Sequence, residues 1–148
     1  MNALTLADAL ATKFKSGTLA PPTGYTAVRV STARVPNAIP LSPWVLVMLP
    51  EGTVTLAAGE LNHSLEFHVL FYYAKSSGDA ARDMTGMLSW LGVLLAACWT
   101  DLDIGVAGVR KAYPQSYRLA VLTHGGEEYY GWDITWVVDF HESVSFQA

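Results

Sequence analysis

The feature that most constrains this sequence is a two-residue alternation near its C-terminus, in the stretch "WDITWVVDFH" at 132–141. Side chains of a strand alternate between the two faces of a sheet, so this period indicates a β-strand and not a helix. One face takes Trp132, Ile134, Trp136, Val138 and Phe140, and the other takes Asp133, Thr135, Val137, Asp139 and His141. We therefore expect a sheet with one face in the core and one towards water or another chain.

Further strand signals precede this stretch. A second alternating run at 64–74 predicts a long strand with one thoroughly apolar side. Shorter signals lie at 25–31, at 44–49, at 53–57 and on each side of Pro114. The "PEG" at 50–52 predicts a hairpin turn between the runs 44–49 and 53–57. Together these signals predict about six or seven strands.

The first helix is predicted at 5–15, where Thr5 and Asp8 have capping-box spacing and apolar residues recur at helical intervals. The second is predicted at 79–98, with apolar residues around most of its circumference, so it needs cover on more than one side. Within it Gly86 and Gly92 each cost about 1 kcal/mol relative to alanine, which predicts close contacts at both.

The order of these elements predicts one α+β domain over residues 1–148. Its largely antiparallel sheet of about six or seven strands packs against two helices, at 5–15 and 79–98.

Composition limits the possible partners. Hydrophobic residues make up 51% of the chain and charged residues only 15%, so we expect a partner to bury part of the apolar surface. The net charge is -4 and the basic residues are scattered, which disfavours binding to a nucleic-acid backbone. The uncharged run 84–100 is too short to cross a membrane and is flanked by Asp83 and Asp101. The N-terminal stretch contains Asp8 and has no basic region, so no signal peptide is expected.

The sequence contains no convergent catalytic motif. The single cysteine, Cys98, falls on the apolar stripe of the second helix, and the four histidines lack metal-site spacing. We therefore assign no catalytic, cofactor-binding or metal-ligating residue and expect no cofactor. One alternative stays open. If the strands at 64–74 and 129–142 pair, then His68, Asp139 and His141 could line the pocket of a small cone-type α+β enzyme.

The order of elements resembles the tail terminator, or tail completion, proteins of long-tailed bacteriophages. The resemblance is carried by a helix introduced by "DAARDMTGML" and by the stretch "AYPQSYRLAVLTHGGEEYYGWDITWVVDFHE" at 112–142. Within that stretch the matching features are the run from Pro114 to Arg118, the glycine hairpin, and the step from Tyr130 to Gly131 that opens the last strand.

This resemblance implies a protein without enzymatic activity that forms a hexameric ring on the last ring of the tail tube. There it stops tube polymerisation and presents the surface to which the head docks. The implied partners are other copies of the chain, the major tail tube protein and a head completion or connector protein. The implied location is the virion tail, after assembly in the host cytoplasm, with DNA passing through the lumen without sequence-specific readout and no contact with a membrane. Another phage neck or tube protein would share most of these features.

A ring requires two different contact patches on each subunit. We expect one on the long strand at 65–73 and the other near 129–133, where alternation leaves Tyr129 and Tyr130 as exposed contacts. On this hypothesis Asp133→Lys shifts the hexamer towards monomer. The candidate contact residues are Glu66, His68, Tyr72, Glu127, Glu128, Tyr129, Tyr130 and Asp133.

Overall fold

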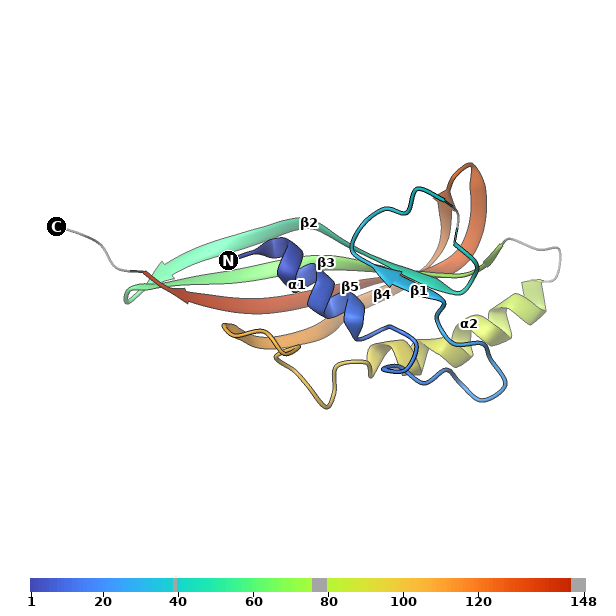
Figure 1. Ribbon diagram of the computed structural model, residues 1–148, viewed down its shortest axis with the longest axis horizontal. Helices are drawn as coiled ribbons and strands as arrows, with labels where there is room; N and C mark the ends of the chain where they lie inside the picture. The colour runs from blue at the N-terminus through green and yellow to red at the C-terminus, as the bar shows by residue number, and fades with distance from the viewer. Residues whose placement is uncertain (39, 76–79, 145–148) are drawn as a thin grey trace.

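Five strands form one sheet in the order β1-β2-β3-β5-β4 in a computed structural model, which describes residues 1–38, 40–75 and 80–144 (Figure 1). The strand β1 runs parallel to β2, and every other neighbouring pair is antiparallel. The predicted α+β class and largely antiparallel sheet are confirmed, but the strands number five instead of six or seven. The elements are α1 (Ala3–Thr12), β1 (Val30–Thr32), β2 (Trp44–Ala57), β3 (Glu60–Lys75), α2 (Ala80–Leu95), β4 (Val109–His124) and β5 (Glu127–Ser143).

The strand count is lower because two prolines lie at β-bulges and not in turns. The hairpin predicted at 50–52 is wrong, since β2 continues through Pro50 and its register against β3 shifts between Met48 and Glu51. Likewise β4 continues through Pro114, with a register shift between Pro114 and Ser116. A bulge tolerates the missing N–H of proline, which a regular ladder position does not. Each bulge therefore joins two predicted strands into one.

The helix α1 begins earlier than predicted. Its N-cap is Asn2, whose side-chain oxygen accepts hydrogen bonds from the amides of Leu4 (3.1 Å) and Thr5 (3.2 Å). An asparagine at this position satisfies amides that have no partner within the helix. The predicted cap at Thr5 is thus wrong, and the helix ends at Thr12 instead of residue 15.

The helix α2 begins at Ala80 and ends at Leu95, three residues before the predicted end, while the predicted start at 79 lies outside the described residues. Met87, Trp90 and Leu94 face the sheet and are buried. On the far side Leu88 is 57% exposed. Leu91, Val93 and Leu95, on its flanks, are partly buried against the same core, so α2 is covered on its sheet side and flanks but not on the side of Leu88.

Both helices pack on one face of the sheet, which we call the helix face. Phe14, which follows α1, meets Trp136 of β5 edge to face at 5.5 Å, and Trp90 of α2 lies 5.0 Å from Phe71 of β3. The indole N–H of Trp132 donates to a backbone carbonyl of α2 at 2.8 Å. The apolar faces predicted for the two long strands are confirmed, since Leu65, Phe67, Val69, Phe71, Trp132, Ile134, Trp136 and Val138 are all buried.

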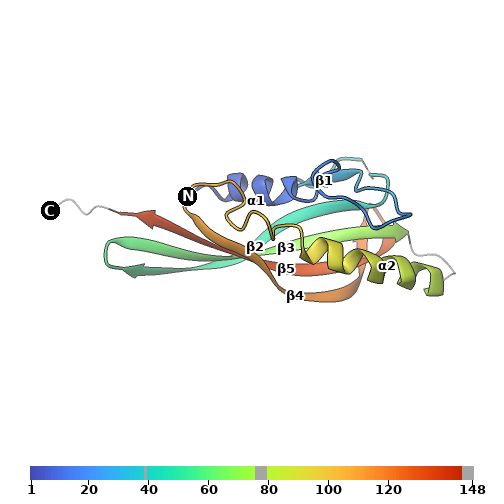
Figure 2. The ribbon, with the colours of Figure 1, turned by 90° about the horizontal axis from the view of Figure 1, so that it is seen from below.

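The opposite side of the sheet carries no helix among the described residues, and we call it the open face. At one end of the molecule the β2–β3 hairpin and the end of β5 extend beyond both helices (Figures 1 and 2). At the other end the connection between β4 and β5 curls out of the plane of the sheet (Figure 1).

Candidate assembly interface

The strands predicted to carry the interface, β3 and β5, lie in the interior of the sheet. They pair with each other from Glu60 opposite Ser143 to Lys75 opposite Tyr129, which is the condition on which the alternative enzyme pocket depended. Each also pairs with an outer strand, β3 with β2 and β5 with β4. Neither strand therefore has a free edge over most of its length, and only their side chains on the open face can meet another subunit.

Near the middle of the open face, the carboxylate of Asp133 lies between the side chains of Arg118 and His68. Its carboxylate accepts hydrogen bonds from Arg118 Nη2 at 3.1 Å and Arg118 Nε at 3.3 Å, and it lies 2.7 Å from His68 Nδ1. Asp133 is only 5% exposed. The expectation that Asp133 is an exposed contact is therefore wrong, and a charge reversal there would test folding as well as assembly.

The residues of the alternative enzyme pocket are not brought together. His68 lies opposite Thr135, whereas His141 lies opposite Asn62, six positions away along β3 or about 20 Å. Asp139 pairs instead with Lys111 at 3.6 Å. The ring of His141 accepts a hydrogen bond from Arg110 at 3.3 Å. Across the described residues, no group of three or more His, Cys, Asp or Glu side chains could hold a metal ion.

Towards the β4–β5 turn, the open face carries a small aromatic core. The rings of Trp44 and Tyr72 stack at 3.9 Å with an interplanar angle of 8°, and Tyr129 meets Tyr72 edge to face at 5.5 Å. Tyr129 is only 1% exposed, so its predicted exposure is wrong. Burial, together with the neighbouring Tyr129, raises the pKa of Tyr72. The run at 44–47, apolar on both faces, is the sequence signal that points to this second core.

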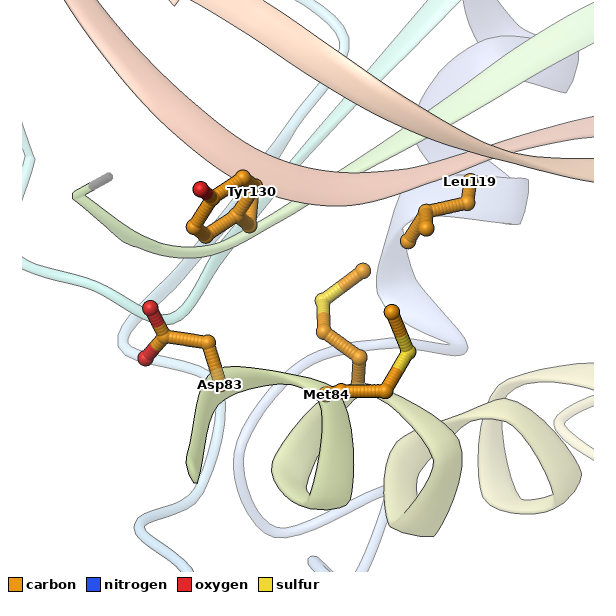
Figure 3. Close-up of a pocket in the computed structure, with 5 residues that line it drawn as sticks. Asp83, Met84, Leu119 and Tyr130 are labelled. Atoms are coloured by element: carbon orange, nitrogen blue, oxygen red, sulfur yellow. The ribbon is translucent and has the colours of Figure 1, made fainter. Parts of the chain in front are cut away.

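The remaining predicted contacts lie apart from one another. Glu127 and Glu128 are exposed at the β4–β5 turn. Glu66 lies on the open face, directly opposite Glu51 of β2. Tyr130 points towards α2, where it lines a small hollow of about 90 Å³ with Asp83, Met84, Met87 and Leu119 (Figure 3).

The two outer strands, which sequence reasoning did not assign to the interface, carry the free edges of the sheet. Among the described residues no strand pairs with the outer side of β4, although the Ala112 amide donates to the carbonyl of Leu102 in the preceding loop at 2.7 Å. The outer side of β2 is paired with β1 only at Trp44–Leu46, which leaves 47–57 free. Each free edge has a row of exposed apolar side chains, Tyr117, Leu119 and Val121 on β4 and Val54 and Leu56 on β2.

Both apolar rows lie on the helix face. On β4, Tyr117 pairs with Ile134 and Leu119 pairs with Trp132, and both partners are core residues of that face. On β2, Val54 pairs with His63, which shares the side of β3 that carries Leu65 and Phe67. If the two edges met without an axial shift, both rows would lie on one face of a continuous sheet but at different heights, because Val54 is level with Val109 of β4 and Tyr117 is level with Val47 of β2. The alternation of "YRLAVL" at 117–122 was the available sequence signal, but it cannot say which strand is outermost.

An apolar groove of about 370 Å³ follows the free edge of β2 just beyond the end of β1. One wall is α1 and the floor is the edge of β2, so the groove has the position that a longer β1 would fill. Leu4 and Leu49 remain partly exposed in it, at 46% and 36%. The lining residues are Ala3, Leu4, Ala7, Ala33, Val35, Leu46, Val47, Met48, Leu49 and Pro50, all of them apolar.

The charges on the two edges have opposite sign. The charged residues of β4 are all basic, namely Arg110, Lys111 and Arg118. The free segment of β2 has one charged residue, Glu51. Each of the three basic residues has an acidic partner within the subunit, which weakens the attraction, but their side chains are 53%, 57% and 76% exposed. Charge therefore favours contact of a β4 edge with a β2 edge over contact between two β4 edges.

Comparison with known proteins gives no family assignment, since no protein-family model and no curated protein matches the chain. A search of the described residues finds no helix with the length and apolar character needed to cross a membrane.

Proposed function

We propose that this protein is a structural protein of a bacteriophage tail that assembles as a ring through the two free edges of its sheet. The observation that carries the proposal is that these edges are different, complementary in charge, and have exposed apolar rows on the same face. Two different patches on one subunit make a heterologous contact, which closes into a ring when the rotation between neighbours allows it.

Strand direction supports this contact. From β2 to β4 there are three antiparallel steps, so the two outer strands run in opposite directions. Rotation about an axis along the strands preserves their directions. The β4 strand of one subunit would then lie antiparallel to the β2 strand of the next. With neighbours at the same height, the contact would cover Tyr117 of β4 and Val54 of β2, which a separate subunit exposes to water.

The place of the ring in the tail rests on the resemblance of 112–142 to tail terminator proteins. On this proposal a hexamer caps the last ring of the tail tube, stops its polymerisation and offers a surface to the head completion or connector protein. Assembly takes place in the host cytoplasm, and DNA passes through the lumen. A neck or tube protein could form a ring through the same edges, so the test must separate ring formation from tube capping.

The first measurement is the mass of the purified protein by size-exclusion chromatography with light scattering, together with negative-stain electron microscopy. We expect rings with a central hole and a mass about six times the 16.0 kDa of the chain. A monomer at every concentration would refute the ring. The second measurement adds the protein to polymerising tail tube protein. A terminator arrests tube growth and binds at tube ends, whereas a tube component is incorporated along the length.

A further inference from the structure

We propose that Tyr117 of one subunit inserts into the apolar groove between α1 and β2 of the next subunit. The inference rests on the proposed function for the existence of a ring, and it specifies which strands meet and at what level. Tyr117 is 52% exposed on the free edge of β4, and the groove borders the free edge of β2.

The register across the sheet sets the level of the contact. Tyr117 lies opposite Ile134, Ile134 opposite Val69, and Val69 opposite Val47. Tyr117 and Val47 are therefore at the same height on the two outer edges, and Val47 lines the groove. In a ring whose axis runs along the strands, neighbours without an axial shift keep this height, so Tyr117 reaches the next subunit at its groove.

Tyr117 and the groove also lie on the same face of the sheet. Tyr117 projects from the helix face, where its ring meets Trp132 edge to face at 5.8 Å. The helix α1, which forms one wall of the groove, lies on the same face. A tyrosine suits such a site because its ring buries a large apolar area while the hydroxyl stays at the wetter rim.

The charges near the groove favour the β4 strand of a second copy as the segment that docks against the β2 edge. On the open face Glu51 stands directly opposite Glu66, and neither carboxylate has an ion-pair partner among the described residues. Lys111 lies on the same face, at the height of Thr53 and only two positions from Glu51. Its ammonium is 3.6 Å from Asp139 of its own subunit, and its side chain is 57% exposed. An arriving β4 strand brings Lys111 close to two like charges that repel each other within the subunit.

Disulfide formation between engineered cysteines tests the contact on the full chain. The variant pair Leu49→Cys with Tyr117→Cys should give a covalent ladder up to the size of the ring after mild oxidation, and neither single variant should give one. The pair Leu49→Cys with Val121→Cys is the matched control, because Val121 is on the same strand and face but about 14 Å further along. The native Cys98 is buried with a pKa of about 12, so it should stay out of the reaction.

The outcomes separate this inference from the proposed function. A ring by light scattering without the Leu49–Tyr117 ladder overturns the groove contact and leaves the ring standing. Covalent dimers from Tyr117→Cys alone would show β4 meeting β4, which also overturns it. A monomer with no ladder would overturn both proposals.

A charge substitution gives a second readout without cysteines. Tyr117→Asp should lower the ring association constant by about tenfold or more, because a carboxylate would be buried in an apolar groove. Leu88→Asp is the control, since Leu88 is similarly exposed (57%) but lies on the side of α2 that faces away from the sheet. Melting curves of both variants establish that the subunit still folds. Equal ring fractions for the two variants would contradict the inference.

Discussion

Arg118 and Asp133 face each other across the β4–β5 ladder, with the guanidinium Nη2 3.1 Å from the carboxylate oxygen Oδ2. The carboxylate is 6% exposed while the arginine side chain is 76% exposed. The arginine therefore covers a buried charge and keeps its own head in water. Because β4 is an outer strand, this pair also fixes the outermost strand to the core of the sheet.

Replacing the arginine should destabilise the subunit. In Arg118→Ala the buried carboxylate keeps His68 but loses the guanidinium, so we expect the free energy of unfolding to fall by about 1.5–3 kcal/mol. The control is Arg110→Ala, because Arg110 pairs with Glu60 at an exposed position and its loss should cost about 0–1 kcal/mol. Urea denaturation of both variants measures the difference. An equal loss of unfolding free energy in both variants would mean that Arg118 stabilises the subunit no more than an exposed ion pair does.

Two glycine substitutions should act in opposite directions. A Cβ at Gly131 would lie 2.0 Å from the carbonyl oxygen of Phe71, so Gly131→Ala should cost about 1–3 kcal/mol or more. A Cβ at Gly92, inside α2, would meet nothing within 4 Å. Gly92→Ala should therefore stabilise the subunit by up to about 1 kcal/mol. Thermal melting of both variants checks the signs, and a loss for Gly92→Ala would mean that something covers that side of the helix.

Stability should fall at alkaline pH because of Cys98. Burial raises the pKa of its thiol from 9.0 to about 12, against the lowering effect of Lys13. Between these values the unfolded chain releases the thiol proton and the folded chain keeps it, so rising pH favours unfolding. From about pH 8 to about pH 10, Cys98→Ala should lose about 1.4 kcal/mol less than the native chain. Tyr72 titrates in both proteins, so the comparison cancels its contribution. Parallel pH dependence in the two proteins would contradict the burial of a protonated thiol.

Removing the charge of Glu51, which lies opposite Glu66, should stabilise the isolated subunit but weaken the ring. Glu51→Gln abolishes the like-charge pair with Glu66, so the melting temperature of the isolated subunit should rise by about 1–3 °C. The same variant loses the carboxylate that we place beside Lys111 of the neighbour, so the ring should weaken at low salt and less so at high salt. Light scattering across a salt series measures this. If the ring is unchanged at low salt, Glu51 is not at the contact.

The helix glycines show where local reasoning succeeds and where it does not. Close packing was predicted at both Gly86 and Gly92. A Cβ at Gly86 would lie 1.8 Å from the hydroxyl of Tyr73, so that prediction is confirmed. At Gly92 it is wrong, because that side of α2 faces away from the sheet. A glycine in a sequence indicates that backbone freedom or space is needed, but only the packing of the neighbouring strands decides which side is crowded.

The faces of the long strands follow from the sequence alone. Alternation at 132–141 and 64–74 correctly separates the helix face from the open face, because successive side chains of a strand must point to opposite sides. The buried Cys98 and the α+β class also follow from local pattern.

The order of the strands, and with it the assembly surface, was decided only by tertiary structure. Local periodicity carries no information on which strands are outermost, since that depends on pairings between distant segments. The contact patches were expected on β3 and β5, whereas the free edges of the sheet lie on β2 and β4. It also turns Pro50 and Pro114 from breaks into bulges, and it buries Asp133 and Tyr129 where alternation alone suggested exposure. A strand's faces are set by its own residues, whereas its neighbours and its edges are set by the rest of the chain.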